Sequence, residues 1–163
     1  MGAFNPGPCE AGLSTKEMNN LLLLAEVHDI GKVGLPDHIL RKNESLTKEE
    51  EEEMKRHCEA GYRIARCSPG LTWVAELILQ HHEWWDGRGY PQGLKGEEIH
   101  LLSRILVIAD AYETITAVRP GKKVMSAEEV ITELKQGAGT RFDPHLVEIF
   151  LKMLQEENGD IFP

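Results

Sequence analysis

The chain has 163 residues, of which 41% are hydrophobic and 28% are charged, and this balance predicts one folded domain rather than a disordered chain. The formal net charge of −9 argues against binding DNA or RNA through a broad basic surface, because such binding requires cationic side chains that neutralise phosphates. An anionic substrate would therefore need metal ions or a few placed lysines and arginines.

Cysteine usage and hydropathy indicate a cytoplasmic protein. The three cysteines, Cys9, Cys58 and Cys67, are odd in number and have no C-x-x-C spacing, so neither a disulfide framework nor a zinc ribbon is predicted. The longest apolar run, residues 21–25, is far shorter than the roughly 20 residues of a membrane span. Residues 1–12 lack a secretory signal and are expected to be a flexible leader before a folded domain over 13–163.

Three capping boxes predict where helices begin. In each, Ser or Thr is followed three residues later by Glu, as in Ser14 with Glu17, Thr47 with Glu50, and Ser126 with Glu129. The helices that they open are expected to end near Asp29–Gly31, near Arg66 and at Gly137.

The remaining elements are also helical. Apolar residues at helical spacing over 71–78 lead into His81-His82, and a buried helix is predicted over 101–118. Between them, residues 86–96 hold too many glycines for a regular element. Asp143-Pro144 predicts the start of a last helix. With no alternating strand pattern, we predict an all-α fold, a compact bundle of five or six helices with a Gly-rich loop.

Six residues with metal-ligand chemistry fall at or near the apolar sides of these helices: His28, Asp29, His57, His81, His82 and Asp110. Buried imidazoles and carboxylates are costly unless they are paired or metal-bound. Taken singly, each has an ordinary explanation, since a lone histidine is more often internally bonded or exposed. Together, they resemble bundle-core metal sites that draw ligands from facing helices.

The donor types indicate which metals could bind. Imidazole and carboxylate without thiolate suit Fe, Mn or Zn and disfavour a structural zinc site. Adjacent residues of a helix point ~100° apart, so His28 and Asp29 can serve different ions, with Asp29 as a bridging carboxylate. Two ions can clamp the attacking and leaving oxygens of a phosphoryl displacement. We expect two divalent ions, Fe or Mn first, with Zn, Ni or Mg as alternatives.

Two segments resemble the signatures of the HD-GYP subgroup of the HD metal-dependent phosphohydrolase superfamily. They are His28–Pro36 (HDIGKVGLP) and His81–Pro91 (HHEWWDGRGYP), and weaker agreement extends from about Leu13 to about Leu154. The resemblance implies hydrolysis of the bacterial second messenger cyclic di-GMP to linear pGpG or to GMP. It also implies that the six ligand residues hold two or three metal ions, commonly iron or manganese.

The resemblance implies catalytic roles for Asp29 and Lys32, with Lys32 at the substrate phosphate, where its charge would neutralise a developing oxyanion. Without the motif, Lys32 would be an ordinary cation at a helix C-terminus. The expected substrate-binding set is Lys32, Asp86, Gly89, Tyr90, Arg119 and Lys122. Gly89 permits close backbone approach to a ligand, and Tyr90 offers either a nucleotide contact or a packing anchor. Asp86 is a candidate to orient a ligand imidazole.

The chain departs from the family pattern in three places. The subgroup has a further helix before Ser14 that supplies a Glu and often a His. Here Glu10 is the only carboxylate before Ser14, so we expect a centre of two metals or weak metal binding. Glu113 stands where the family usually has Asp. Residues 119–122 (Arg-Pro-Gly-Lys) replace Arg-Pro-Tyr-Arg, which predicts weaker guanine or phosphate recognition because a ring and a guanidinium are lost.

Three functions remain open from the sequence. The first is an active cyclic di-GMP phosphodiesterase, and the second is an HD hydrolase of another nucleotide or phosphate ester. The third is a non-catalytic module that binds a cyclic dinucleotide or a protein. The expected partners are the cyclic dinucleotide and either an upstream sensory domain or a diguanylate cyclase.

Overall fold

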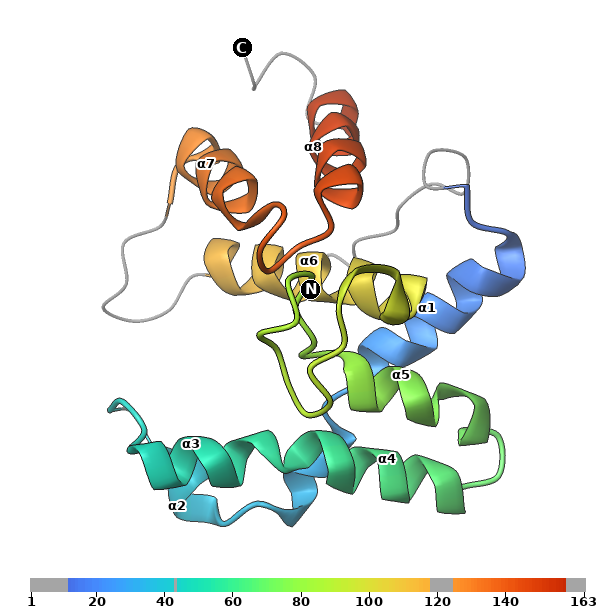
Figure 1. Ribbon diagram of the computed structural model, residues 1–163, viewed down its shortest axis with the longest axis vertical. Coiled ribbons are helices and arrows are strands. Elements are labelled where there is room, and N and C mark those ends of the chain that lie inside the picture. Colours follow the sequence, from blue (N-terminus) through green and yellow to red (C-terminus); the bar gives the residue numbers. More distant parts are fainter. Residues whose placement is uncertain (1–11, 43, 118–124, 158–163) are drawn as a thin grey trace.

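The computed structural model in Figure 1 describes residues 12–42, 44–117 and 125–157, and this part of the chain is α-helical with no β-ladder. The α-helices are α1 (Thr15–Val27), α2 (Asp37–Leu40), α3 (Lys48–Lys55), α4 (His57–Cys67), α5 (Ala75–Gln80), α6 (Leu101–Thr116), α7 (Ala127–Gly137) and α8 (Pro144–Glu157). Three 3-10 segments join them, namely η1 (Ile30–Gly34), η2 (Thr72–Val74) and η3 (Gly96–Glu98). The all-α prediction is confirmed.

All three predicted capping boxes form, at Ser14, Thr47 and Ser126. The predicted N-cap Asp143 also forms, because its Oδ1 accepts from the backbone N–H groups of His145 at 3.0 Å and Leu146 at 3.4 Å. Each cap satisfies backbone donors that a helix start leaves without partners. Local sequence therefore fixes where four of the helices begin.

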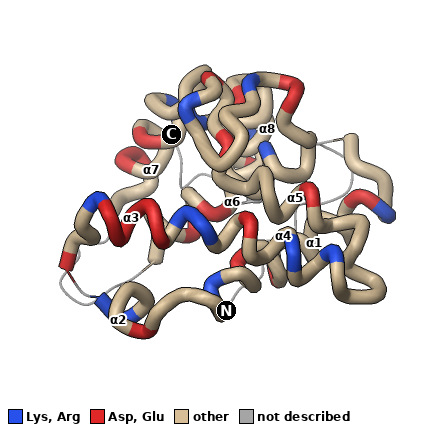
Figure 2. Tube along the Cα trace, turned by 60° about the horizontal axis from the view of Figure 1, so that its bottom comes forward, with Lys and Arg blue, Asp and Glu red and all other residues tan. Residues whose placement is uncertain are grey.

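The described residues contain more helical segments than the five or six predicted, since the helix expected from Thr47 to Arg66 is divided. Arg56, with φ −66° and ψ −13°, separates α3 from α4. The four-residue α2 was not predicted. The break places His57 on the first turn of α4, and the acidic run of α3 gives way to Lys55 and Arg56 just before it (Figure 2).

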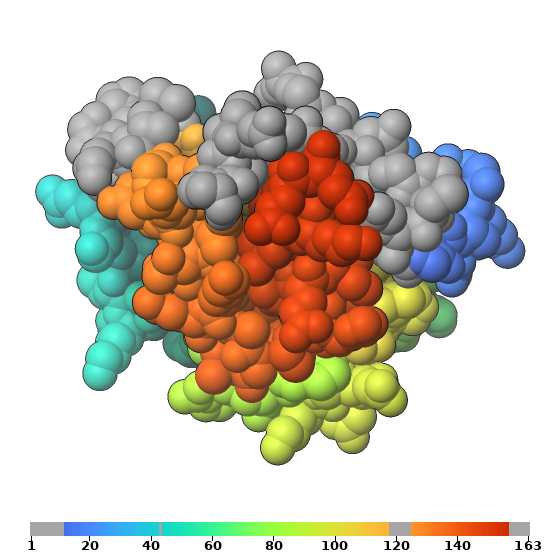
Figure 3. All heavy atoms as spheres, turned by 90° about the horizontal axis from the view of Figure 1, so that it is seen from above, coloured from blue at the N-terminus to red at the C-terminus, as the bar shows by residue number. Residues whose placement is uncertain are grey.

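Helix α6 lies between two apolar clusters and joins them into one molecule. Leu102 and Leu106 of α6 pack in the first cluster with buried residues of α1, α4 and α5. Ile108 and Ala111 pack in the second cluster with α7 and α8. Figure 1 shows α6 between α5 on one side and α7 and α8 on the other, and Figure 3 shows α7 and α8 next to each other. Within the described ranges, no helix is long and apolar enough to cross a membrane.

The closest backbone approach that concerns the site is between η1 and α4. A Cβ added to Gly31 would lie 1.9 Å from the carbonyl oxygen of His57 and 2.5 Å from the backbone nitrogen of Gly61. A Cβ added to Gly61 would lie 2.8 Å from Cγ2 of Ile78 on α5. Both positions therefore require glycine, because any side chain would force the segments apart.

We expect Gly31→Ala to lower the free energy of unfolding by about 1–3 kcal/mol or more, because the added methyl would overlap the backbone of α4. The measurement is chemical denaturation followed by circular dichroism. Gly34→Ala is the matched control, since it lies in the same segment and an added Cβ there meets nothing within 4 Å. Equal stability of the two variants would contradict the close approach.

Candidate metal centre

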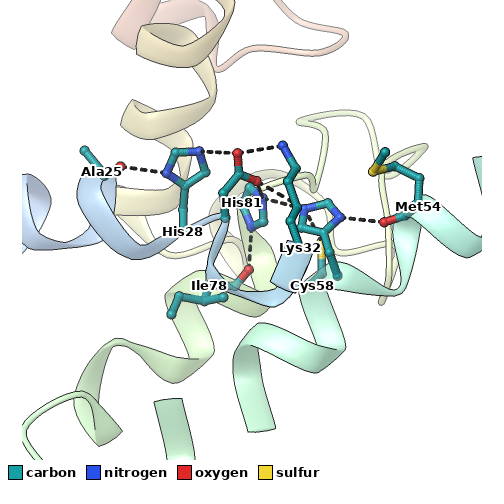
Figure 4. Close-up of polar contacts among 9 residues, drawn as sticks. Ala25, His28, Lys32, Met54, Cys58, Ile78 and His81 are labelled. Carbon is teal, nitrogen blue, oxygen red and sulfur yellow. Dashed lines mark hydrogen bonds and ion pairs between the residues drawn. The ribbon is translucent and has the colours of Figure 1, made fainter. Parts of the chain in front are cut away.

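The end of α1 presents His28 and Asp29 to the interior of the site. His28 is the C-cap of α1, and its Nδ1 donates to the carbonyl of Ala25 at 2.8 Å. This bond fixes the proton on Nδ1 and leaves a lone pair on Nε2. The Nε2 of His28 lies 3.5 Å from Oδ2 of Asp29 (Figure 4). The side chain of His28 is thus oriented as a metal ligand would be.

His57 and His81 face each other with the same tautomer. The Nδ1 of His57 donates to the carbonyl of Met54 at 2.6 Å, and the Nδ1 of His81 donates to the carbonyl of Ile78 at 2.5 Å. Their Nε2 atoms are 3.2 Å apart. Since each Nδ1 carries the proton, two nitrogen lone pairs point toward each other in a buried site. A divalent cation between the rings would turn this repulsion into coordination, so the residues present fit a metal.

Asp29 lies between these histidines and a lysine. Its Oδ1 is 3.6 Å from Nε2 of His57 and 3.9 Å from Nε2 of His81. Its Oδ2 accepts from Nζ of Lys32 at 2.6 Å. One carboxylate oxygen thus faces the His57–His81 pair, and the other faces His28 and Lys32. This arrangement is compatible with the bridging role expected for Asp29, which stays a prediction.

A fourth imidazole and a thiol complete the buried cluster. The donor atoms of His57, Cys58, His81 and His82 all lie within 4.8 Å of one another. The ring of His82 is 4.1 Å from that of His81, and it stacks on the ring of Tyr90 at 4.9 Å with an interplanar angle of 29°. Tyr90 therefore covers the site by packing on one of its predicted ligands.

Burial controls the protonation of the cluster. It lowers the pKa of His57, lowers that of His81 to about 3, and lowers that of His82 to about 2. Burial alone would raise the pKa of Asp29, but the hydrogen bond from Lys32 and the nearby histidines outweigh it, so that pKa is lowered. At neutral pH, the site therefore presents neutral imidazoles and an ionised carboxylate, the forms that bind metals.

Comparisons with known proteins identify the family of this chain. The sequence pattern of the HD domain family matches residues 10–146. This chain belongs to the HD domain family. It is 42% identical over 155 residues to a cyclic di-GMP phosphodiesterase of Thermotoga maritima, covering 94% of this chain and 42% of that protein. It is 38% identical over 145 residues to the cyclic di-GMP phosphodiesterase response regulator RpfG of Xanthomonas campestris, covering 88% of this chain and 38% of that protein.

Solved structures support the fold of this HD domain. A cyclic GMP-AMP-specific phosphodiesterase from Vibrio cholerae matches with a TM-score of 0.68 and 23% identity, over 91% of this chain and 41% of that one. The chain spans less than half the length of each of these relatives. The predicted membership of the HD superfamily is confirmed, and the named phosphodiesterases agree with the HD-GYP subgroup.

Of the other predicted site residues, the structure describes Asp110 but not Arg119 or Lys122. Asp110 is half-buried on α6 and acts electrostatically on Tyr90, whose pKa is raised by burial first and then by Cys58 and Asp29, with a smaller contribution from Asp110. Its role as a metal ligand stays a prediction. The predicted substrate residues Arg119 and Lys122 lie outside the described residues.

The Gly-rich loop of the HD domain is stabilised by contacts between its own residues. Both oxygens of Asp86 bond Arg88, to its backbone N–H at 3.0 Å and its Nε at 2.6 Å, so its partner here is not the imidazole that the sequence suggested. A Cβ on Gly89 would lie 2.2 Å from the backbone nitrogen of Trp84. Glycine is therefore required at 89 by this internal packing, whether or not a ligand also approaches.

Sequence reasoning missed Glu83, which braces the same loop. Its side chain is 1% exposed and accepts from the backbone N–H groups of Gln92 at 2.6 Å and Leu94 at 3.0 Å. The loop is also tied to the segment before α8, because the N–H of Asp86 donates to the carbonyl of Thr140 at 2.9 Å. The sequence feature that could have indicated this role is an acidic residue placed directly between His81-His82 and the glycine-rich loop.

We expect Glu83→Gln to destabilise the protein by about 1–3 kcal/mol, because the amide of Gln replaces one buried acceptor by a donor that faces a backbone N–H. Hydrogen exchange at Gln92 and Leu94 should become faster. Glu97→Gln, an exposed acid on η3, is the control. Unchanged exchange at 92 and 94 in Glu83→Gln would show that Glu83 does not hold the loop.

The stability of the metal-free protein should fall as the pH falls from about 6.5 to 5. The folded pKa values of His57, His81 and His82 lie below the unfolded value of about 6.5, so the unfolded chain binds more protons in this window. Each such histidine then costs up to about 1.4 kcal/mol per pH unit. Thermal melts in chelator across this range measure the slope.

His81→Gln should reduce that slope, whereas His38→Gln, at an exposed position on α2, should not. A melting temperature that does not change between pH 6.5 and 5 would mean that the three imidazoles are not buried in the neutral form.

Proposed function

We propose that this HD domain is a metal-dependent phosphodiesterase that hydrolyses cyclic di-GMP to linear pGpG or GMP in bacterial second-messenger signalling. The observation that carries the proposal is the pair of facing, unprotonated Nε2 atoms of His57 and His81 with an oxygen of Asp29 beside them. The relatives named as cyclic di-GMP phosphodiesterases support the choice of substrate.

The proposed centre holds two divalent ions, Fe or Mn first, with Zn, Ni or Mg as alternatives, through His28, Asp29, His57, His81, His82 and Asp110. Bound ions of this kind activate water and polarise phosphoryl oxygens. His28, His57 and His81 are held in their ligand tautomer by backbone carbonyls. Asp29 presents one oxygen to each half of the site, as a bridging ligand would.

Lys32 is the proposed phosphate-binding cation. Its Nζ is held by Asp29, and its side chain remains 40% exposed, so the ammonium can also meet a ligand that enters from solvent. Three rotatable donors on Nζ allow it to keep Asp29 and contact a non-bridging phosphate oxygen at once. A preorganised cation of this kind stabilises charge that develops on the phosphoryl group.

Substrate recognition is proposed to involve Asp86, Gly89, Tyr90, Arg119 and Lys122. Tyr90 offers the clearest support, because its ring stacks on His82 and Nζ of Lys55 lies 5.6 Å from the ring centroid. These contacts fix the ring at the edge of the cluster, where a nucleotide would pass. Regulation by a sensory domain or a diguanylate cyclase is a further part of the proposal, supported by the relative named as a response regulator.

A second candidate substrate is 3'3'-cGAMP. A Vibrio cholerae relative named as a 3'3'-cGAMP-specific phosphodiesterase is 38% identical over 147 residues. The same metal chemistry would serve both cyclic dinucleotides, since they share the phosphodiester and differ in a base. A substrate panel therefore has to include both.

The test is hydrolysis by protein loaded with Mn or Fe, measured by chromatography of cyclic di-GMP, 3'3'-cGAMP and an unrelated phosphodiester. We expect cleavage of cyclic di-GMP, no turnover by His81→Ala, and a fall in turnover of about 10²–10³ for Lys32→Gln, because one charge-stabilising donor is lost. Lys48→Gln, at an exposed position on α3, is the control.

Wild-type turnover by His81→Ala would contradict the proposed centre. Tight binding of cyclic di-GMP by the metal-loaded protein without cleavage would instead support the non-catalytic binding module. Cleavage of only the unrelated ester would favour a different HD hydrolase.

A further inference from the structure

Cys58 is a buried thiol that the proposed hydrolysis does not use. It is the second residue of α4 and has no exposed surface. Its Sγ lies 3.7 Å from Nε2 of His57, the nitrogen that also faces His81. Figure 4 shows Cys58 in the same group of side chains as Lys32 and His81. The thiol thus lies among the buried donor atoms of the cluster.

The tautomer of His57 determines which hydrogen bond the thiol of Cys58 can make in the metal-free protein. Because Nδ1 of His57 donates to Met54, its Nε2 can only accept, and the S–H of Cys58 is positioned to donate to it. A cation bound by the lone pair of Nε2 takes the place of that S–H proton. A cation bound there would lie close to the sulfur, because the donor atoms of His57, Cys58, His81 and His82 all lie within 4.8 Å of one another.

We propose that Cys58 supplies a thiolate ligand to the metal ion held by His57, His81 and His82. This inference rests on the proposed metal centre and alters its donor set, which the sequence predicted to contain no thiolate. Coordination requires the thiolate, so the Sγ proton is released to solvent as the metal–sulfur bond forms. A sulfur donor favours Zn, Fe or Co over Mn or Mg at this position.

X-ray absorption of the zinc-loaded protein tests the inference directly. Cys9→Ser/Cys67→Ser leaves Cys58 as the sole thiol among the three cysteines of the chain, so any thiolate bound to zinc comes from Cys58. We expect one sulfur at about 2.3 Å beside nitrogen and oxygen ligands at about 2.0–2.1 Å. In the triple variant that also carries Cys58→Ser, the sulfur signal should be absent while zinc remains bound.

Metal selectivity gives a second readout that packing alone would not produce. Cys58→Ser should lower zinc affinity at least tenfold and change manganese affinity much less, so the Zn/Mn affinity ratio falls. Cobalt-loaded wild-type protein should show sulfur-to-cobalt charge-transfer absorption that Cys58→Ser lacks and Cys67→Ser, at an exposed position on the same helix, retains.

Circular dichroism melts identify any variant that fails to fold. The X-ray absorption spectrum of the Cys9→Ser/Cys67→Ser protein is a test that keeps Cys58 in place, so it holds even if Cys58→Ser does not fold. Bound zinc with only nitrogen and oxygen ligands would overturn the role of Cys58 and leave the proposed hydrolysis intact. Failure of the folded wild-type protein to bind any of these metals would overturn both proposals.

Discussion

The centre depends on the close approach of η1 to α4. The backbone of Gly31 lies against the carbonyl of His57, so the segment that carries Asp29 and Lys32 is positioned by the same residue that supplies a predicted ligand. Side-chain packing could shift by fractions of an ångström, whereas a backbone contact without a Cβ has almost no freedom to adjust. Asp29, two residues before Gly31, has its Oδ1 3.6 Å from Nε2 of His57.

Burial then gives the cluster its chemical character. Burial keeps His57, His81 and His82 neutral, and hydrogen bonds from Nδ1 to backbone carbonyls turn the Nε2 lone pairs of His57 and His81 inward. Such an arrangement costs stability in the absence of a cation, because the Nε2 atoms of His57 and His81 lie 3.2 Å apart and only the weak S–H donor of Cys58 reaches the first of them. The net charge of −9 does not oppose this role, since the relevant field is local and Lys32 holds its partly exposed ammonium against Asp29.

Sequence predicted the parts of the structure that local rules decide. Capping boxes gave three helix starts, and the His-Asp and His-His pairs gave residues that lie together in the structure. It did not predict the break at Arg56, because no proline or glycine marks that position. Cys58 and Glu83 were missed for a related reason. Their roles depend on which residues they meet across the fold, and a thiol or an acid next to histidine carries no such information alone.

The side chains of the predicted centre differ strongly in exposure to solvent. The side chains of His57 and His81 are 1% and 3% exposed, whereas those of Asp29 and Lys32 are 39% and 40% exposed. Solvent therefore meets the carboxylate and the ammonium first, with the imidazoles behind them. In the proposed function, a phosphodiester that approaches from this side would meet Lys32 before the predicted ligands His57 and His81, and Tyr90, stacked on His82, would lie at one edge of that approach. On that proposal, the exposed ammonium of Lys32 would be the first positive charge that a phosphate meets, with the buried histidines behind it.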